Sequence, residues 1–270
     1  AQKGLITVKP ARIKLAEGRL NAELTLDARA KAASKIQANS SSKPQATLEG
    51  AVNTQGIQLA NLLAQLKQEP LLAGDFVSNV AFTSYGHTDQ DLTKNLEANI
   101  TLNSQSLKLT NMNIEKSFCE AASLLTGNPP SEATWPAYSQ LSPVSLSARY
   151  AQDKITLTAL NADIQKLKVS SRGELNLASG DFKFPLDVSL ADFANGVTGC
   201  NIVDTQWRTR IVPLRCKGNV INIGAKTCLP DGPRITQLLK NKAKTEVAER
   251  LDKAKNTAED KAKKEGLHLI

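Results

Sequence analysis

The sequence predicts a mainly β protein: a long, curved antiparallel sheet of repeated β-hairpins, a β-groove, with a few short helices and a C-terminal amphipathic helix. Apolar and polar residues alternate along many short segments, as in strands with one buried face. Polar turns separate these segments. Hydrophobic residues make up 41% of the chain but aromatic residues only 4%, so the core must be aliphatic, which favours strands.

The hairpin prediction rests on five units in which four turn-forming residues separate two apolar residues. Two-residue hairpin turns require positive φ at one or both central residues, and small polar pairs accept it. We therefore expect each unit to be a hairpin. The units are residues 15–20, 52–57, 102–107, 150–155 and 177–182.

A longer repeat links two of these units, because residues 52–61 resemble residues 102–111 at an offset of fifty. Apolar runs that predict helices follow each copy, from Leu59 to Leu66 and from Ile114 to Leu125. Modules of this kind stack side by side, since one hairpin cannot bury its own apolar face. We expect residues 1–232 to form the β domain and residues 233–270 a charged helical tail.

Four cysteines occur without a C-x-x-C pair, so a zinc site is not expected. The even number favours disulfides formed in an oxidising compartment, with buried free thiols as the alternative. Three connectivities are possible. Cys216 and Cys228 bracket a short strand and turn and are favoured as one pair, which leaves Cys119 with Cys200.

Several functional classes receive no support. The formal net charge is +8, but no basic block carries interleaved aromatic residues, so nucleic-acid binding is not expected. His87 and His268 are the two histidines, and neither belongs to a catalytic or metal-binding pattern, so we expect no enzyme and no cofactor. No apolar run reaches 18 residues, which argues against a transmembrane segment. A start at Ala1 without Met or a leader favours a piece of a longer protein.

The remaining feature is an apolar sheet face that one thin helix and few aromatic residues cannot cover. If this face stays open, it forms a slot for acyl chains, since hydrophobic contact requires area and not particular side chains. A sandwich that buries the face is the alternative. The residues expected to line the lipid groove are Val80, Phe82, Leu102, Leu107, Leu109, Ile155, Leu157, Phe182 and Phe184.

Several segments, in order, resemble the C-terminal region of the AsmA family. They are a strand, turn and Leu-rich helix at residues 55–63 with a degenerate copy at 105–114, a Thr-aromatic segment at 134–135, a Gly-to-Leu strand at 173–177 and a closing strand at 212–218. The similarity covers roughly residues 5–232. Ser106 departs from the turn glycine usual in the family, and cysteines are not a general family feature.

The resemblance implies a periplasmic β structure of a Gram-negative envelope protein, anchored in the inner membrane by an N-terminal helix. Members are similar to bridge-like lipid carriers and are implicated in phospholipid movement to the outer membrane. The expected partner is a phospholipid or another acyl-chain lipid. A scaffold that assists outer-membrane protein or lipopolysaccharide assembly, through sheet edges or the Lys-rich tail, remains the alternative.

Overall fold

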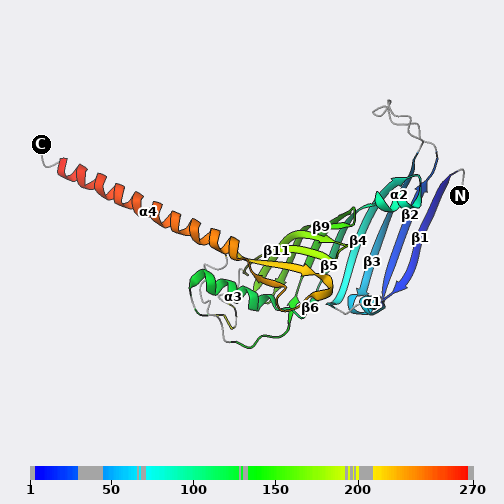
Figure 1. Ribbon diagram of the computed structural model, residues 1–270, viewed down its shortest axis with the longest axis horizontal. Coiled ribbons are helices and arrows are strands. Elements are labelled where there is room, and N and C mark those ends of the chain that lie inside the picture. The colour runs from blue at the N-terminus through cyan, green and yellow to red at the C-terminus, as the bar shows by residue number, and fades with distance from the viewer. Residues whose placement is uncertain are drawn as a thin grey trace, which may run out of the picture.

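The computed structural model shows a mainly β chain, with 54% strand and 24% helix, organised around one large antiparallel sheet. Figure 1 shows the sheet at one end of the molecule and a long helix that projects from the other. The structure describes residues 4–29, 45–65, 67, 71–127, 129, 133–191, 194, 197, 199, 200 and 209–266.

The strands of the large sheet follow one another almost in chain order, each antiparallel to its neighbour. In spatial order they are β1 (Leu5–Leu15), β2 (Gly18–Asp27), β3 (Ala46–Gln58), β4 (Leu72–Gly86), β5 (Glu97–Ser104), β8 (Val144–Ala151), β9 (Lys154–Ile164), β10 (Leu167–Asn176), β11 (Asp181–Leu190), β12 (Val212–Asn219) and β13 (Cys228–Pro230). The described strands thus form a single layer that does not fold back as a sandwich.

The remaining elements gather at the ends of these strands. Two short strands, β6 (Leu107–Thr110) and β7 (Tyr138–Leu141), pair with each other, and β6 also pairs with the first residues of β4. The helices are α1 (Leu59–Gln65), α2 (Asp89–Lys94), α3 (Ile114–Thr126), a 3-10 turn (Val220–Asn222) and α4 (Gly232–Gly266).

Three of the five expected hairpins are present. The β1–β2 turn has positive φ at Ala16 and Glu17, the β8–β9 turn has positive φ at Gln152 and Asp153, and the β10–β11 connection has it at Gly180. Gly180 suits such a conformation, whereas Ala, Glu and Gln adopt positive φ rarely. Each turn connects strands that are neighbours in the sheet.

The units at residues 52–57 and 102–107 are not hairpins, so that prediction was wrong. In the first, β3 continues through the unit, and Gly56, with φ of 62°, forms part of a bulge opposite β4. In the second, the chain passes from β5 to β6 without reversing, because both strands pair with β4. Turn residues therefore mark a bulge or a kink at these places.

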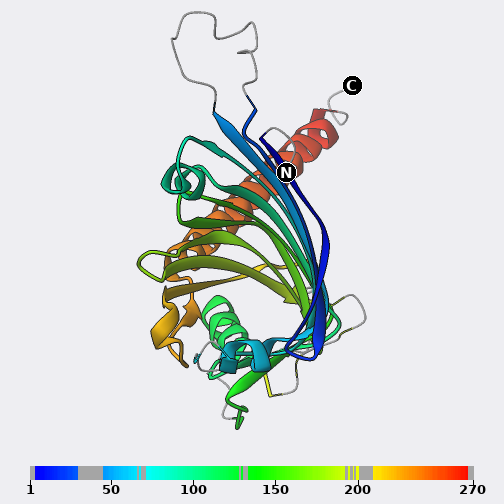
Figure 2. The same cartoon turned by 90° about the vertical axis from the view of Figure 1, so that its right-hand side faces the viewer.

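The sheet is strongly curved, and Figure 2 shows it bending around α3. Bulges bend a strand and increase its twist. Three strands carry one in the described sheet: β1 between Val8 and Ala11, β3 between Thr54 and Ile57, and β9 at Thr158, where the pairing with both neighbours shifts. The curvature gives the sheet an inner, concave face and an outer face.

α3 covers the inner face at the C-terminal end of the sheet. Phe118 and Ala122 of this helix are fully buried in a core that also contains Ile164, Val188 and Leu214 of the strands. Burying one aromatic side chain of this kind contributes on the order of 2 to 3 kcal/mol. This part of the structure is a two-layer β/α core.

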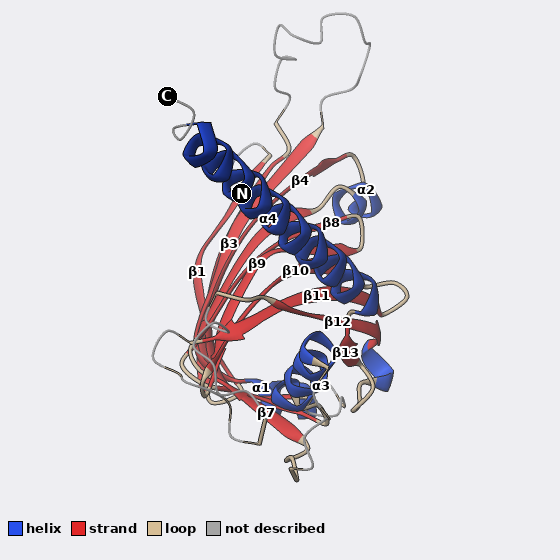
Figure 3. Ribbon diagram, turned by 90° about the vertical axis from the view of Figure 1, so that its left-hand side faces the viewer, coloured by secondary structure: helices blue, strands red, loops and turns tan. Residues whose placement is uncertain are grey.

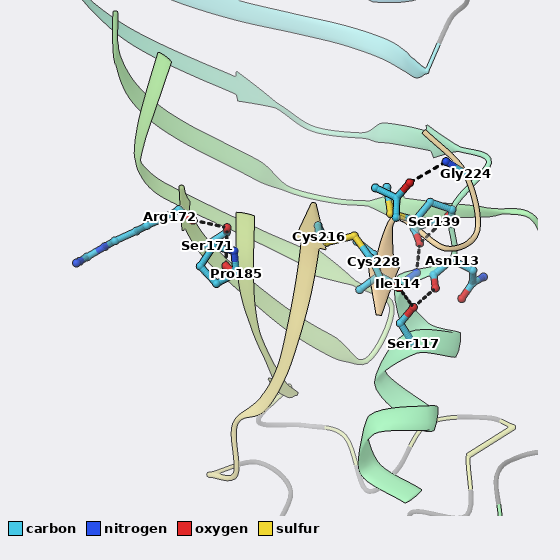
Figure 4. The surroundings of a disulfide bond; sticks show 12 residues. Asn113, Ile114, Ser117, Ser139, Ser171, Arg172, Pro185, Cys216, Gly224 and Cys228 are labelled. Carbon is cyan, nitrogen blue, oxygen red and sulfur yellow. Dashed lines mark hydrogen bonds between the residues drawn. A yellow bond between two sulfur atoms is a disulfide. The ribbon is translucent and has the colours of Figure 1, made fainter. Parts of the chain in front are cut away.

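Hydrogen bonds fix the start of α3, as Figure 4 shows. The Asn113 side-chain oxygen caps the helix by accepting from the backbone N–H of Lys116 at 2.7 Å. The backbone N–H of Ile114 donates to Ser139 Oγ at 2.7 Å, and Ser117 Oγ donates to the carbonyl oxygen of Cys228 at 2.8 Å. The helix is thereby tied to β7 and to β13.

All four cysteines form disulfides, in the two pairs that the sequence favoured. Cys119 of α3 joins Cys200, and Cys216 of β12 joins Cys228 of β13. Both bonds lie at the C-terminal end of the sheet. Disulfides persist in oxidising compartments such as the bacterial periplasm.

We predict that the two disulfides contribute unequally to stability. In the chain-entropy view, a bond that closes a longer loop restricts the unfolded chain more. Replacing Cys119 and Cys200 by Ala, which opens a separation of 81 residues, should lower the unfolding free energy by about 4.5 kcal/mol. The same change at Cys216 and Cys228, with a separation of 12, should cost about 3 kcal/mol. Urea titration measures both, and a larger loss for the second pair would contradict the prediction.

Candidate functional site

The inner face of the large sheet is the candidate functional site, because strand register carries two rows of side chains across it, of which Thr54 and Ser78 interrupt only the first. Cross-strand partners follow one another from Leu20 in β2 to Thr54 in β3, Ser78 in β4, Leu102 in β5 and Leu146 in β8. A second row passes through residues that are almost all apolar. It consists of Ala22, Val52, Val80, Ile100, Ala148, Leu157 and Gly173.

Seven of the nine residues expected to line a groove lie on this face of the sheet, as the register of their strands places them there. They are Val80, Phe82, Leu102, Ile155, Leu157, Phe182 and Phe184. Leu107 and Leu109 lie instead on β6, outside the main strand path, and pack against the core under α3.

The inner face is covered unevenly by helices. α3 covers the ends of the later strands, α1 packs near Ile57 and Phe76, and α2 lies at the opposite end of β4. Between them, Val80 and Phe82 are only half-buried although they lie in the middle of the sheet. No described layer therefore covers this part of the inner face.

β1 carries the most exposed part of the same face. Ile6, Val8 and Ile13 pair with Leu26, Leu24 and Leu20 and are 45%, 41% and 52% exposed. Sequence reasoning did not include these three residues in the groove. Apolar residues alternate along residues 5–15 and could have predicted this strand face, but the bulge at Lys9-Pro10 interrupts the alternation.

Polar side chains on the inner face form their hydrogen bonds within the protein. The hydroxyls of Thr54 and Ser78 pair with each other at 2.8 Å. Ser104 Oγ donates to the carbonyl oxygen of Asp75 at 2.6 Å, and Ser171 Oγ donates to that of Pro185 at 2.8 Å. In the described residues no buried side-chain nitrogen or oxygen lacks a partner. The face therefore presents hydrocarbon to a ligand, with few polar groups to recognise one.

Two phenylalanine rings lie across glycines of the neighbouring strand. A Cβ atom at Gly50 would be 2.4 Å from Phe82 Cζ, and one at Gly173 would be 2.4 Å from Phe184 Cδ1. Any larger residue at either position would displace the ring. The absence of a side chain thus lets the aromatic rings lie flat on the concave face.

The outer face differs in character. A shallow hollow of about 520 Å³ opens there, lined by residues that include Glu49, Thr83 and Asn99. The exposed ion pair of Arg149 Nη2 with Glu97 Oε2, at 2.5 Å, borders it. Exposed ion pairs contribute little to stability or binding. The hollow is a solvated surface.

Titratable groups with shifted pKa values lie away from the centre of the inner face. Hydrogen bonds from the His87 backbone and the Thr88 hydroxyl lower the pKa of Asp91, within the capping box that begins α2. Burial raises the pKa of Glu115 in the first turn of α3. Neither arrangement pairs a base with a nucleophile.

Comparison with known protein families, curated proteins and solved structures finds no match to this chain. The resemblance to the AsmA family therefore rests on the sequence motifs alone. In the described residues, no helix is long and apolar enough to cross a membrane.

We predict that Glu115 limits stability near neutral pH. Its raised pKa means that the folded state favours the protonated carboxyl, so its contribution is fully favourable below the unfolded pKa of about 4.3 and is lost as pH rises through the folded value. Glu115→Gln should raise the melting temperature at pH 7.5, and the gain should vanish at pH 4.

Glu120→Gln is the matched control for this variant. Glu120 lies on the same helix but is 39% exposed and pairs with Lys116, so its loss should change stability by no more than about 0.5 kcal/mol. An equal effect of both substitutions, or a Glu115→Gln gain that persists at pH 4, would show that the buried charge is not the cause.

Proposed function

We propose that the chain is a non-enzymatic, periplasmic lipid-binding module whose inner sheet face holds or conducts the acyl chains of phospholipids between the inner and outer membranes. Val80, Phe82, Leu102, Ile155 and Phe184 contact the hydrocarbon, together with Ile6, Val8 and Ile13 of β1. Leu157 and Phe182 are 7% and 8% exposed and support the face without forming its contact surface. No residue acts chemically. The inner-membrane anchor implied by the AsmA resemblance belongs to this proposal.

A single observation carries the proposal: apolar residues continue in register across the strands while the middle of their face stays half-exposed. An ordinary single-layer sheet buries its apolar face under helices or a second sheet. Here the described helices cover mainly the strand ends. Exposed apolar surface of this extent indicates a partner.

The dimensions of the face favour lipid. The five strands β1 to β5, whose middle no described helix covers, lie about 4.8 Å apart and extend for about 19 Å across the sheet. One leaflet of a bilayer has a hydrocarbon thickness of about 15 Å, half of the usual core. The uncovered part of the face is therefore about as long as one acyl chain.

The chemistry of the inner face favours a ligand that binds through apolar contact area and not through specific hydrogen bonds. Thr54 and Ser78 satisfy each other, and the other inner hydroxyls bond to backbone carbonyls. Among the described residues no buried side-chain donor there lacks a partner, so a polar substrate would lose its hydration without compensation. A hydrocarbon chain has no polar groups to desolvate, and its binding releases water from apolar surface. The two disulfides support an oxidising compartment.

We predict that phospholipid co-purifies with the chain. Native mass spectrometry of detergent-free protein should show masses increased by one or more phospholipids, which organic extraction removes. Protein that is lipid-free after native purification, and that also takes up no lipid from vesicles, would contradict the proposal. It would favour the alternative of a scaffold for envelope assembly.

A charge on the inner face should abolish lipid loading. In Val80→Asp, a carboxylate enters the centre of the proposed path, and acyl chains cannot solvate it. Ala81→Asp is the matched control, because Ala81 is the next residue on β4, is exposed and faces the outer side. We expect at least about a tenfold loss of bound lipid for the first variant and little change for the second.

Ile13→Asp extends this test to a site that hardly affects folding, since Ile13 is 52% exposed. Thr7→Asp, on the outer side of the same strand, is its control. Thermal unfolding identifies variants that lose lipid only because they unfold. Equal lipid content in Ile13→Asp and Thr7→Asp would exclude β1 from the path.

A further inference from the structure

A cleft lies between α2 and the turn that joins β8 to β9. Its volume is about 520 Å³, which is in the usual range of ligand sites. Figure 3 shows α2 beside β4 and β8 at this end of the sheet. α2 packs on the inner side, because the hydroxyl of Ser84, a residue of the inner face, donates to the carbonyl oxygen of Leu92. The cleft therefore borders the inner face.

Tyr150 connects this cleft to the apolar part of the inner face. It lines the cleft, and its cross-strand partner Ala98 is also the partner of Phe82, so the three residues form one row on the inner face. The Tyr150 hydroxyl donates to Asp153 Oδ1 at 3.2 Å. A tyrosine at such a boundary offers its ring to hydrocarbon and its hydroxyl to polar groups. An amphiphile therefore fits with its apolar part on the inner face and its polar part in the cleft.

Three exposed side chains give the cleft both signs of charge: Asp89 and Lys94 of α2, and Asp153 of the β8–β9 turn. Within the described part of the chain, the Asp89 carboxylate and the Lys94 ammonium form no hydrogen bond or ion pair. Asp153 accepts from Tyr150 and has a second oxygen for a ligand. Asp89 and Lys94 lie about 7.5 Å apart along the helix axis, so one ligand reaches both only if it carries separated charges.

We propose that this cleft binds the headgroup of a phospholipid that carries a primary ammonium, as phosphatidylethanolamine does. Lys94 contacts the phosphate, and Asp89 and Asp153 accept hydrogen bonds from the ammonium. The acyl chains then lie on the inner face, beginning at Tyr150 and Phe82. The inference rests on the proposed function and names the class of lipid that the inner face holds.

The lining of the cleft disfavours the other common headgroups. Phosphatidylglycerol has a phosphate but no cation, so the two carboxylates repel it and leave only Lys94 to attract it. Phosphatidylcholine has a cation, but its quaternary ammonium has no N–H group to donate to Asp89 or Asp153. Quaternary ammonium groups bind in cages of several aromatic rings, whereas Tyr150 is the one aromatic residue among the described residues that line the cleft.

The test measures which lipids the full chain takes up from vesicles with equal amounts of phosphatidylethanolamine, phosphatidylcholine and phosphatidylglycerol. The vesicles are removed, and mass spectrometry gives the composition of the lipid extracted from the protein. We expect phosphatidylethanolamine to be enriched about fivefold over each of the others, as two exposed charge-assisted contacts allow. Bound lipid with the composition of the vesicles, or enriched in either of the other two lipids, would overturn the proposal.

The double variant Asp89→Asn with Asp153→Asn removes both negative charges from the cleft. The enrichment of phosphatidylethanolamine over phosphatidylcholine should fall to less than about twofold, while the total amount of bound lipid changes by less than about twofold. The helix keeps its capping box, since Thr88 and Asp91 are unchanged. Enrichment that persists in this variant would overturn the assignment of the two carboxylates.

The matched control is Glu23→Gln with Glu49→Gln, which removes two negative charges from exposed positions on the outer face of β2 and β3. It should keep the enrichment of phosphatidylethanolamine. Equal loss of enrichment in both double variants would overturn the proposal, since net charge alone would then determine which lipid binds.

Two results separate this inference from the proposed function. A chain that takes up no lipid from any vesicle contradicts lipid binding by the inner face, whereas lipid bound without headgroup preference contradicts only the cleft. Soluble phosphoethanolamine, which has the same charged groups without acyl chains, should not displace bound lipid at an equal concentration. Displacement would show that the cleft binds a small polar molecule and would overturn the lipid as its ligand.

Discussion

The structure depends on one constraint: a single-layer sheet must shield an apolar face from water without a second sheet. Curvature provides part of the shielding, because side chains on a concave surface crowd together. Ala98, Ala148 and Leu157 are buried although no described helix packs on them. Small residues and the two glycines that receive phenylalanine rings allow the bend, and bulges in β1, β3 and β9 supply it.

Local chemistry determined which parts of the fold were predictable. The hairpins with turns at Ala16-Glu17 and Gln152-Asp153 were predictable from the spacing of apolar residues around a polar segment, although Ala, Glu and Gln rarely adopt positive φ. The same composition around Gly56 forms a bulge, because whether a strand reverses depends on its neighbour β4, which lies about twenty residues further along the chain. α2 was missed because its six residues are defined by a capping box and carry no apolar period.

The sequence predicted part of the candidate site, as it predicted part of the fold. Alternation assigned Val80, Ile155 and Phe182 to one face because strand geometry has a strict period of two. It could not separate the uncovered part of this face from the part beneath α3, since that depends on where a helix docks. Leu107 illustrates the limit: the sequence predicts it at the start of the strand after a hairpin turn, yet the kink after β5 places it in the covered core.

The two disulfides and the α3 core lie at the same end of the sheet, whereas only the short helices α1 and α2 pack on the ends of β3 and β4. Stability in a protein follows local packing, so these two ends should differ in how readily they deform. The C-terminal end, which α3 and both disulfides hold together, should be more rigid than strands β1 to β5. Bending of strands β1 to β5 would therefore change the width of the concave side of the sheet. The C-terminal end, from which α4 departs, would keep its shape.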